Sequence, residues 1–386
     1  MQTNITFLMP SLLIGGVELV LLRTLRELST KKDISLSVIL NEPITAQQFI
    51  DFFNLHPNIN VVVCYKWLHL FKKLEKWTNF FPAKNIRKCI YSLYKKYRIF
   101  KVKHNTVYKN ADVLIDYKNF NFYHWLKGSK KIKIGWFHGG IDCFNEYDFI
   151  KKVGIYDKIV CLSDSFLIDF THQYPEYAEI INRIYNPIDC EEIQEKSCHE
   201  RPDYGNYFCV VSRLDVDKDI KTVILGFNKF LLQEKKQDIY LLIVGSGPSL
   251  SELQVFANTQ ECRNNIIFVG EKQIPFGYMR GAIAHILSSY SEGLPTVLIE
   301  AQSVGTLNIS SNCKSGVAEI LLDGDAGILF EPGNADELAN ALSDVWNGRV
   351  DTKQMIQNAT KSLARFEPKS IADEIIKLVN ELKGEK

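Results

Sequence analysis

Short apolar runs alternate with helix-like segments along the whole of this 386-residue chain. The predicted strands of a first series occupy residues 5–9, 35–40, 60–65, 113–117, 132–137 and 158–163. Those of a second series occupy residues 207–214, 240–248, 266–270, 282–289, 306–311 and 326–331. Alternating β and α units favour right-handed crossovers and parallel sheets. The alternation therefore predicts an α/β protein made of two doubly wound domains with a cleft between them.

A polar stretch separates the two series. Residues 191–206 are rich in charge and poor in large apolar side chains, as is usual at a domain boundary. We therefore expect a first domain over residues 1–190, a linker over 191–206 and a second domain over 207–386. In open α/β sheets, ligands bind beyond the carboxyl ends of the strands. The loops that directly follow strands are therefore the places to search for a site.

The cysteine spacing and the length of the apolar runs indicate the cellular compartment in which the protein works. The nine cysteines are scattered and no two have CxxC spacing, which indicates a reduced compartment without a disulfide framework or a zinc ribbon. No stretch approaches the ~18 unbroken apolar residues of a membrane span. The apolar N-terminus lacks a basic region and is interrupted by Glu18, so a strand, a loop and a helix explain it better than a signal peptide. We therefore expect a cytoplasmic protein.

Positive charge is concentrated in one segment although the net charge is only +1. Residues 66–133 hold eighteen Lys and Arg residues against three acids, and aromatic side chains interleave with the cations over 66–109. This combination is typical of a surface for anionic lipid headgroups. The expected membrane contacts are Lys72, Lys73, Lys76, Trp77, Lys95 and Lys96. A helical hairpin with a solvated basic face is the alternative, and nucleic acid is not expected because no nucleic-acid module is recognised.

Glycines follow two of the predicted strands. Gly15 and Gly16 stand between a strand and a helix, where the backbone can approach a ligand and the helix N-terminus offers free N–H groups. A plain tight turn is the alternative, and Glu18 in the first turn would repel a phosphate placed beside it. Gly245 and Gly247 do not complete a GxGxxG pattern, and no acid ends a strand about 20 residues later. We therefore do not expect an NAD site.

Two cations share one short loop after a strand. Arg213 and Lys218 could clamp a diphosphate, with arginine as the bidentate member, or could form a solvated charge pair. Asp215 and Asp217 form a DxD pattern, which can hold a divalent metal between phosphates. The same pattern recurs at residues 323–325, so we assign no metal to it.

Two glutamates bracket the start of an expected helix in residues 288–301, SSYSEGLPTVLIEA. The proline fits the first helical position, so the amides of Gly293 and Leu294 would point at a bound anion. Glu300, among apolar neighbours, could accept hydrogen bonds from both hydroxyls of a ribose, and Glu292 could hold another polar group. The pattern predicts a nucleoside diphosphate site, with a surface helix carrying two ordinary acids as the alternative.

Together these motifs resemble a retaining glycosyltransferase of family 4, of the bacterial polysaccharide and lipopolysaccharide type. The resemblance rests on five motifs in the family's order, which are IGGVE, NPID, SRLDVDKDIKTVI, IVGSGP and the E-x7-E pair. It implies the GT-B fold, in which two Rossmann-like domains face a central cleft. The first domain would bind the acceptor, the second would bind the nucleotide sugar, and the last helix would cross back to the first domain.

The resemblance also implies a role for each site residue. Arg213 and Lys218 would bind the donor diphosphate and stabilise it as it leaves, while Glu292 would contact the donor sugar. His138, in the stretch GWFHGG, would lie near the transferred sugar. The remaining donor contacts would come from Gly16, Gly245, Gly270, Glu271, Gly293, Leu294 and Glu300. Acceptor contacts would come from Gly15 and Glu18.

The implied function is transfer of a hexose or N-acetylhexosamine from a nucleotide sugar, with UDP as the expected nucleotide. The acceptor would be a lipid-linked saccharide in the synthesis of capsule, O-antigen or lipooligosaccharide, at the inner face of the cytoplasmic membrane. No metal and no cofactor is expected, because the two cations would take their place. Two alternatives stay open: a nucleotide-sugar epimerase of the same fold, and a non-catalytic scaffold that docks on membranes.

Overall fold

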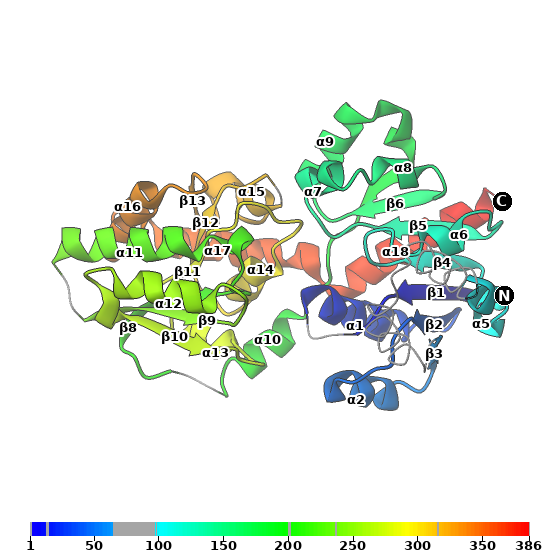
Figure 1. Cartoon of the computed structure of the whole chain (residues 1–386), viewed down its shortest axis with the longest axis horizontal. Helices are drawn as coiled ribbons and strands as arrows, with labels where there is room; N and C mark the ends of the chain where they lie inside the picture. Colours follow the sequence, from blue (N-terminus) through cyan, green and yellow to red (C-terminus); the bar gives the residue numbers. More distant parts are fainter. Residues whose placement is uncertain are drawn as a thin grey trace, which may run out of the picture.

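A computed structural model describes residues 2–12, 15–64, 97, 99–199, 202–235, 238–314 and 316–385. They form two α/β domains that lie side by side along the long axis of the molecule (Figure 1). The expected membrane contacts at Lys72, Lys73, Lys76, Trp77, Lys95 and Lys96 lie outside the described residues.

A seven-stranded sheet with the order β3-β2-β1-β4-β5-β6-β7 forms the centre of the first domain. Its strands are β1 Thr3–Met9, β2 Ile34–Leu40, β3 Ile59–Val63, β4 Val113–Asp116, β5 Ile132–Trp136, β6 Lys158–Cys161 and β7 Ile181–Arg183. Its helices include α1 Gly16–Leu28, α2 Gln47–Leu55, α5 Thr106–Asn110, α6 Tyr123–Leu126, α7 Ile141–Glu146, α8 Ile150–Val153 and α9 Asp164–Gln173. Neighbouring strands are parallel, and β1 and β5 are buried on both faces, as helices on both sides of a parallel sheet require.

A six-stranded sheet with the order β10-β9-β8-β11-β12-β13 forms the centre of the second domain. Its strands are β8 Asn206–Val211, β9 Ile239–Val244, β10 Ile266–Gly270, β11 His285–Leu287, β12 Asn308–Ser311 and β13 Ile328–Phe330. Its helices include α11 Ile220–Glu234, α12 Leu250–Asn258, α13 Phe276–Arg280, α14 Thr296–Ser303, α15 Val317–Ile320 and α16 Ala335–Trp346. The strand order reverses at β1/β4 in one sheet and at β8/β11 in the other, and such switch points are where α/β sheets bind ligands. The predicted pair of doubly wound domains is confirmed.

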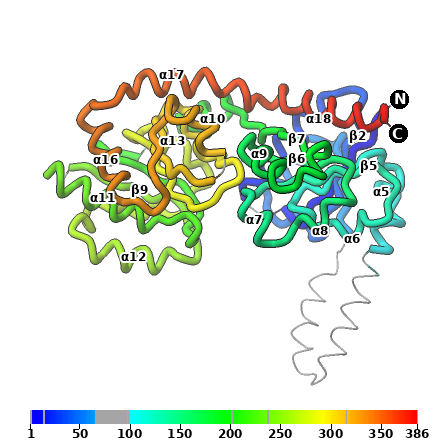
Figure 2. The backbone as a smooth tube through the Cα atoms, turned by 90° about the horizontal axis from the view of Figure 1, so that it is seen from above, coloured from blue at the N-terminus to red at the C-terminus, as the bar shows by residue number. Residues whose placement is uncertain are grey.

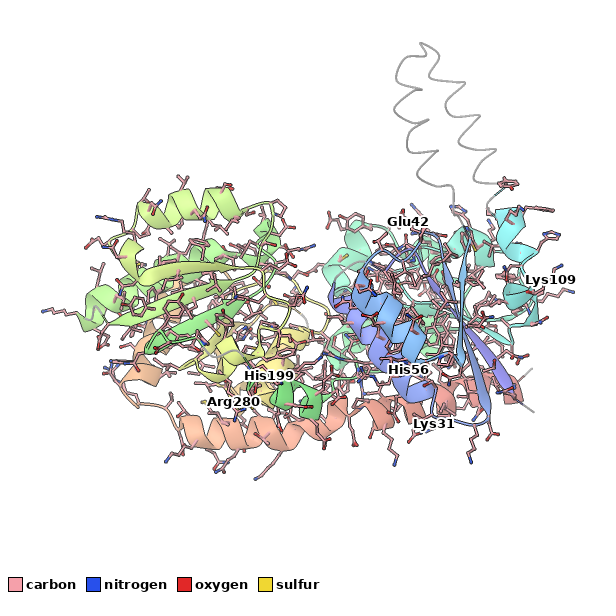
Figure 3. The ribbon with its side chains drawn as sticks, turned by 90° about the horizontal axis from the view of Figure 1, so that it is seen from below. Lys31, Glu42, His56, Lys109, His199 and Arg280 are labelled. Carbon is pink, nitrogen blue, oxygen red and sulfur yellow. The ribbon has the colours of Figure 1, made fainter. Side chains whose placement is uncertain are left out.

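Two chain segments connect the domains. Helix α10, Cys190–Lys196, begins one residue before the stretch that we expected as a linker. The Arg280 guanidinium donates a hydrogen bond to Ser197, which directly follows α10, and Figure 3 shows Arg280 beside this helix. Helices α17, Thr352–Ser362, and α18, Pro368–Gly384, follow the second sheet. Figure 2 shows α18 running along the first domain, where the Lys31 ammonium lies 2.6 Å from the Asp373 carboxylate.

Two element boundaries around the glutamate pair differ from our expectation. The strand expected over residues 282–289 is shorter, since β11 covers only His285–Leu287. Ser288 instead donates to the Lys218 carbonyl oxygen in the loop after β8, and Ser289 donates to the Glu292 carboxylate in its own loop. Helix α14 begins at Thr296, and Pro295 stands just outside it with ψ 92°, so our placement of the proline at the first helical position was wrong by one residue.

Candidate functional site

The loops after β5 and β11 meet where the two domains face each other. His138 and Gly140 follow β5, whereas Glu292 and Gly293 follow β11. A Cβ on Gly293 would lie 2.2 Å from the carbonyl oxygen of His138, and a Cβ on Gly140 would lie 2.6 Å from that of Glu292. The backbones of the two domains are therefore in contact here, and side chains at these two glycines would separate them.

An ion pair on the second domain stands beside this contact. The Lys218 ammonium lies 2.7 Å from Oε1 of Glu292 and 3.3 Å from the Asp217 carboxylate, and Ser289 donates to the same Oε1 at 2.6 Å. The Lys218 and Glu292 side chains are only 15% and 16% exposed. Burial opposes the charge on Lys218, but the two carboxylates outweigh it and raise its pKa. Lys218 is therefore a fixed cation at the edge of the interdomain contact.

Hydrogen bonds join the loop after β8 to the loop after β11. Ser288 donates to the Lys218 carbonyl oxygen at 2.7 Å, and the Tyr290 N–H donates to that of Asp217 at 3.0 Å. Asp219 adopts a left-handed backbone with φ 45° and accepts a hydrogen bond from the Thr222 hydroxyl at 2.6 Å. These contacts set the position of Lys218 relative to Glu292, although 74 residues separate them in the chain.

Arg213 is held far more loosely than Lys218. Its side chain is 64% exposed, and its guanidinium lies 3.6 Å from the Asp215 carboxylate and 3.8 Å from that of Asp217. Contacts that long and exposed contribute little to stability, so the guanidinium is free to turn toward a ligand. The DxD acids thus face Arg213, and the described part of the chain holds no group of three or more His, Cys, Asp or Glu residues suited to a metal.

Glu300 projects from α14 between apolar neighbours. Leu298 and Ile299 are fully buried, whereas Glu300 is partly open to solvent. Burial raises the pKa of its carboxyl, and Arg23 on α1 of the first domain acts in the opposite direction. Leu294, at the start of this segment, is buried and anchors it. Arg23, which sequence analysis did not single out, therefore places a first-domain cation in the electrostatic environment of Glu300.

The glycines after β9 and β10 are explained by local packing and backbone conformation. A Cβ on Gly245 would lie 1.9 Å from the carbonyl oxygen of Ser212, so this glycine lets the loops after β8 and β9 pack together. Gly270 has φ +83°, a left-handed backbone that favours glycine. Glu271 is exposed, and its carboxylate accepts a hydrogen bond from the Ser246 hydroxyl at 2.9 Å. Gly245 is therefore required by the close packing of two loops. Glu271 lies on the surface of the same domain.

His138 has a defined tautomer. Its Nε2 lies 2.8 Å from the Tyr117 carbonyl oxygen, which can only accept, so Nε2 carries the proton. Its Nδ1 is buried and has no hydrogen-bond partner among the described residues. Burial lowers the pKa of the ring to about 4, and the nearby Lys118 ammonium acts in the same direction. The imidazole is therefore neutral at physiological pH and offers the lone pair of Nδ1.

A second ion pair covers the glycine loop of the first domain. The Glu18 carboxylate, on α1, lies 2.6 Å from the Lys118 ammonium, which follows β4. A Cβ on Gly15 would lie 2.7 Å from Oε2 of Glu18, so the glycine leaves room for this carboxylate. Apart from its chain neighbours and the backbone of its own helix, a Cβ on Gly16 would meet no described atom within 4 Å. Sequence analysis did not single out Lys118, and its place directly after a strand was the signal that could have identified it.

Seven of the predicted residues thus form two clusters and one loosely held cation, and the others stand apart from these groups. Lys218, Glu292, Gly293 and His138 meet at the interdomain contact. Gly15 and Glu18 meet Lys118 on the first domain, whereas Arg213 extends from its own loop toward solvent.

Comparison with known proteins gives a consistent result for the second domain. Residues 191–362 match the family model described as glycosyl transferases group 1. The N-acetylgalactosamine-N,N'-diacetylbacillosaminyl-diphospho-undecaprenol 4-alpha-N-acetylgalactosaminyltransferase of Campylobacter jejuni is 26% identical over 203 residues, 53% of this chain and 53% of that protein. The lipopolysaccharide 1,6-galactosyltransferase of Salmonella typhimurium is 26% identical over 188 residues, 45% and 48% of the two chains. The chain spans about half the length of these curated relatives.

The likeness of fold extends over both domains. Anabaena HepE, solved in complex with UDP, superposes with a TM-score of 0.74 at 17% identity and covers 98% of this chain and 100% of its own. The chain therefore has the GT-B fold expected from its motifs, and its residues 191–362 match the group 1 glycosyl transferases.

Proposed function

We propose that this chain is a retaining glycosyltransferase of family 4 that moves a hexose or N-acetylhexosamine from a UDP-sugar to a lipid-linked saccharide in cell-envelope polysaccharide synthesis. One observation carries the proposal: the Lys218–Glu292 pair of the second domain stands beside the backbone contact with His138 of the first. Group transfer needs residues for two substrates on opposite walls of one site, and this contact supplies both walls.

The second domain offers what a nucleoside diphosphate needs. The Glu300 carboxylate can accept hydrogen bonds from two ribose hydroxyls. The amides of Gly293 and Leu294, before α14, can bind phosphate oxygens. Lys218 adds a fixed positive charge and Arg213 a mobile one, so the phosphates can be bound by a guanidinium that turns toward them.

The same groups account for the chemistry. As the diphosphate departs, C1 of the sugar becomes oxocarbenium-like, and Lys218 and Arg213 stabilise the negative charge that develops on the leaving group. The acceptor hydroxyl attacks from the same face, and the leaving phosphate takes its proton. His138 is neutral, so it places no charge beside the transferred sugar. The backbone contact between the domains excludes water, and the two cations do the work that a metal would do.

The names of the relatives support the proposed acceptor class. The Campylobacter protein is named for an undecaprenol diphosphate-linked acceptor and the Salmonella protein for lipopolysaccharide, which supports a lipid-linked saccharide as the acceptor. An acceptor of this class would in turn place the protein at the inner face of the cytoplasmic membrane. Anabaena HepE supports UDP as the nucleotide. In the part of the chain that the structure describes, no helix is long and apolar enough to cross a membrane.

Nucleotide release is the experiment that tests the proposal. The protein and its Glu300→Ala variant are given a panel of UDP- and GDP-sugars, with and without a lipid-linked saccharide extract. We expect one UDP-sugar to release UDP, the extract to increase the rate and the variant to lose it. Glu261→Ala removes an exposed acid of the same domain and serves as the matched control.

Other outcomes would support the alternatives. An epimerised donor without a glycosidic product would favour the epimerase. Silence across the panel, from folded protein that still binds anionic vesicles, would favour the scaffold. The anomeric proton of the product would show whether configuration is retained.

A further inference from the structure

The loop after β4 has an unusual backbone. Asn119 and Phe120 both adopt left-handed conformations, with φ 51° and 56°, which non-glycine residues rarely do. The Phe120 ring fills the place of a side chain at Gly135 of β5, where a Cβ would lie 2.4 Å from it. β4 and β5 are neighbours in the first sheet (Figure 1). Such a conformation persists only where surrounding contacts over-determine it.

A buried carboxyl group provides those contacts. Asp116 ends β4 and is 0% exposed. Its Oδ2 accepts hydrogen bonds from the Phe122 N–H and from the Tyr156 hydroxyl, both at 2.8 Å. The first bond closes the loop from residue 116 to residue 122, and the second fastens it to the segment before β6. The carboxyl group of Asp116 thus determines the path of the loop from residue 116 to residue 122.

The loop in turn holds the first-domain wall of the site. The Tyr117 carbonyl oxygen accepts from His138 Nε2 at 2.8 Å, and Asn119 Oδ1 accepts from the His138 N–H at 2.8 Å. Lys118, between them, pairs with Glu18 at 2.6 Å. Three consecutive residues of one loop therefore fix the ring of His138, its backbone and the Glu18 carboxylate.

We propose that Asp116 is a positioning residue of the site: by closing the loop after β4, it holds His138 as the Nε2-protonated tautomer and places Lys118 against Glu18. It acts through the loop and contacts neither substrate. That the orientation of His138 matters for sugar transfer rests on the proposed function. That Asp116 sets this orientation does not, so the two claims can be tested separately.

The first test is the titration of His138, followed by NMR in full-length protein with ring-labelled histidine and assigned with a His138→Gln variant. We expect the wild type and Asp116→Asn, whose amide oxygen can still accept both hydrogen bonds, to show one tautomer and a midpoint near 4. In Asp116→Ala we expect a mixture of tautomers and a midpoint closer to the ordinary value of about 6.5. A His138 titration unchanged in Asp116→Ala would overturn the proposal.

Asp112→Ala is the matched control. Asp112 precedes the opposite end of the same strand, where its carboxylate accepts from the Asn4 N–H at 2.8 Å. It should lower stability without moving the His138 titration, and an equal effect at both positions would reduce Asp116 to a structural residue. If Asp116→Ala does not fold, Tyr156→Phe removes one of the two hydrogen bonds and should shift the titration in the same direction by less.

The second test is kinetic. Asp116→Ala should lower kcat by roughly 10- to 100-fold while the KM for the donor changes little, because misplacing a site group by about 1 Å can cost 10²-fold. Asp116→Asn should keep a kcat close to that of the wild type. Absence of turnover in the wild type with every donor would refute the proposed function, whereas the His138 titration would still decide the role of Asp116.

Discussion

The contribution of Asp116 to the stability of this protein should fall as pH rises from 4 to 7. Burial raises the pKa of its carboxyl from 3.8 to about 7, although hydrogen bonds from Tyr156, Phe122 and Lys118 and the charge of Lys152 act in the opposite direction. In this interval the folded protein keeps the proton that the unfolded chain releases. The contribution is therefore fully present below pH 3.8 and is lost as pH rises through the folded value of about 7.

The size of the effect follows from the interval. About three pH units correspond to about 4 kcal/mol in the free energy of unfolding, at ~1.4 kcal/mol per unit. Asp116→Asn removes the titration and keeps an oxygen that accepts both hydrogen bonds. The free energy of unfolding of the variant, relative to wild type, should therefore rise by about 4 kcal/mol between pH 4 and pH 8.

The assay is urea unfolding followed by tryptophan fluorescence at pH 4, 5, 6, 7 and 8, since Trp125 and Trp136 are buried in the same domain. Asp203→Asn, at an exposed position, is the control for the change in net charge and should run parallel to wild type. Other groups titrate in both proteins, so only the difference between variant and wild type counts. A constant difference from pH 4 to pH 8 would refute the reasoning.

Three further changes probe the two walls of the site. Gly293→Ala should lower kcat at least tenfold without unfolding the protein, because its Cβ would meet the His138 carbonyl oxygen; unchanged kcat would contradict the contact. Lys218→Ala should lower kcat by about 10²–10³, as loss of one charge-stabilising donor does, and equal kcat in variant and wild type would exclude it from the leaving-group site. Gly15→Ala should displace the Glu18 carboxylate and raise the acceptor KM, with donor KM as the internal control.

The architecture could be predicted because it depends on periodicity. The alternation of apolar strands and helices predicted both sheets. The rule that ligands bind at the carboxyl ends of strands predicted that the loops with Lys218 and Glu292 would form the site. The pairing of these two could not be predicted. It depends on the shift of Ser288 and Ser289 from the expected strand into a loop whose hydroxyls hold Lys218 and Glu292.

Glycines in loops predicted the site residues less well than the position of a residue directly after a strand. Gly245 belongs to a motif typical of ligand loops, yet its side-chain position is filled by the Ser212 carbonyl oxygen, which is a packing reason. Gly15 has a packing reason as well, since it makes room for the Glu18 carboxylate. Lys118 carries no motif at all, and its importance arises from an ion pair across 100 residues of chain.

The tautomer of His138 shows why such details lie beyond sequence. It is set by a backbone carbonyl, that of Tyr117, and any residue at position 117 would supply the same oxygen. What makes the oxygen available is the path of the loop, which depends on a carboxyl buried at residue 116 and on two left-handed residues that follow it. A histidine after a strand is therefore recognisable in the sequence as a candidate, whereas its protonation state is a property of the folded loop.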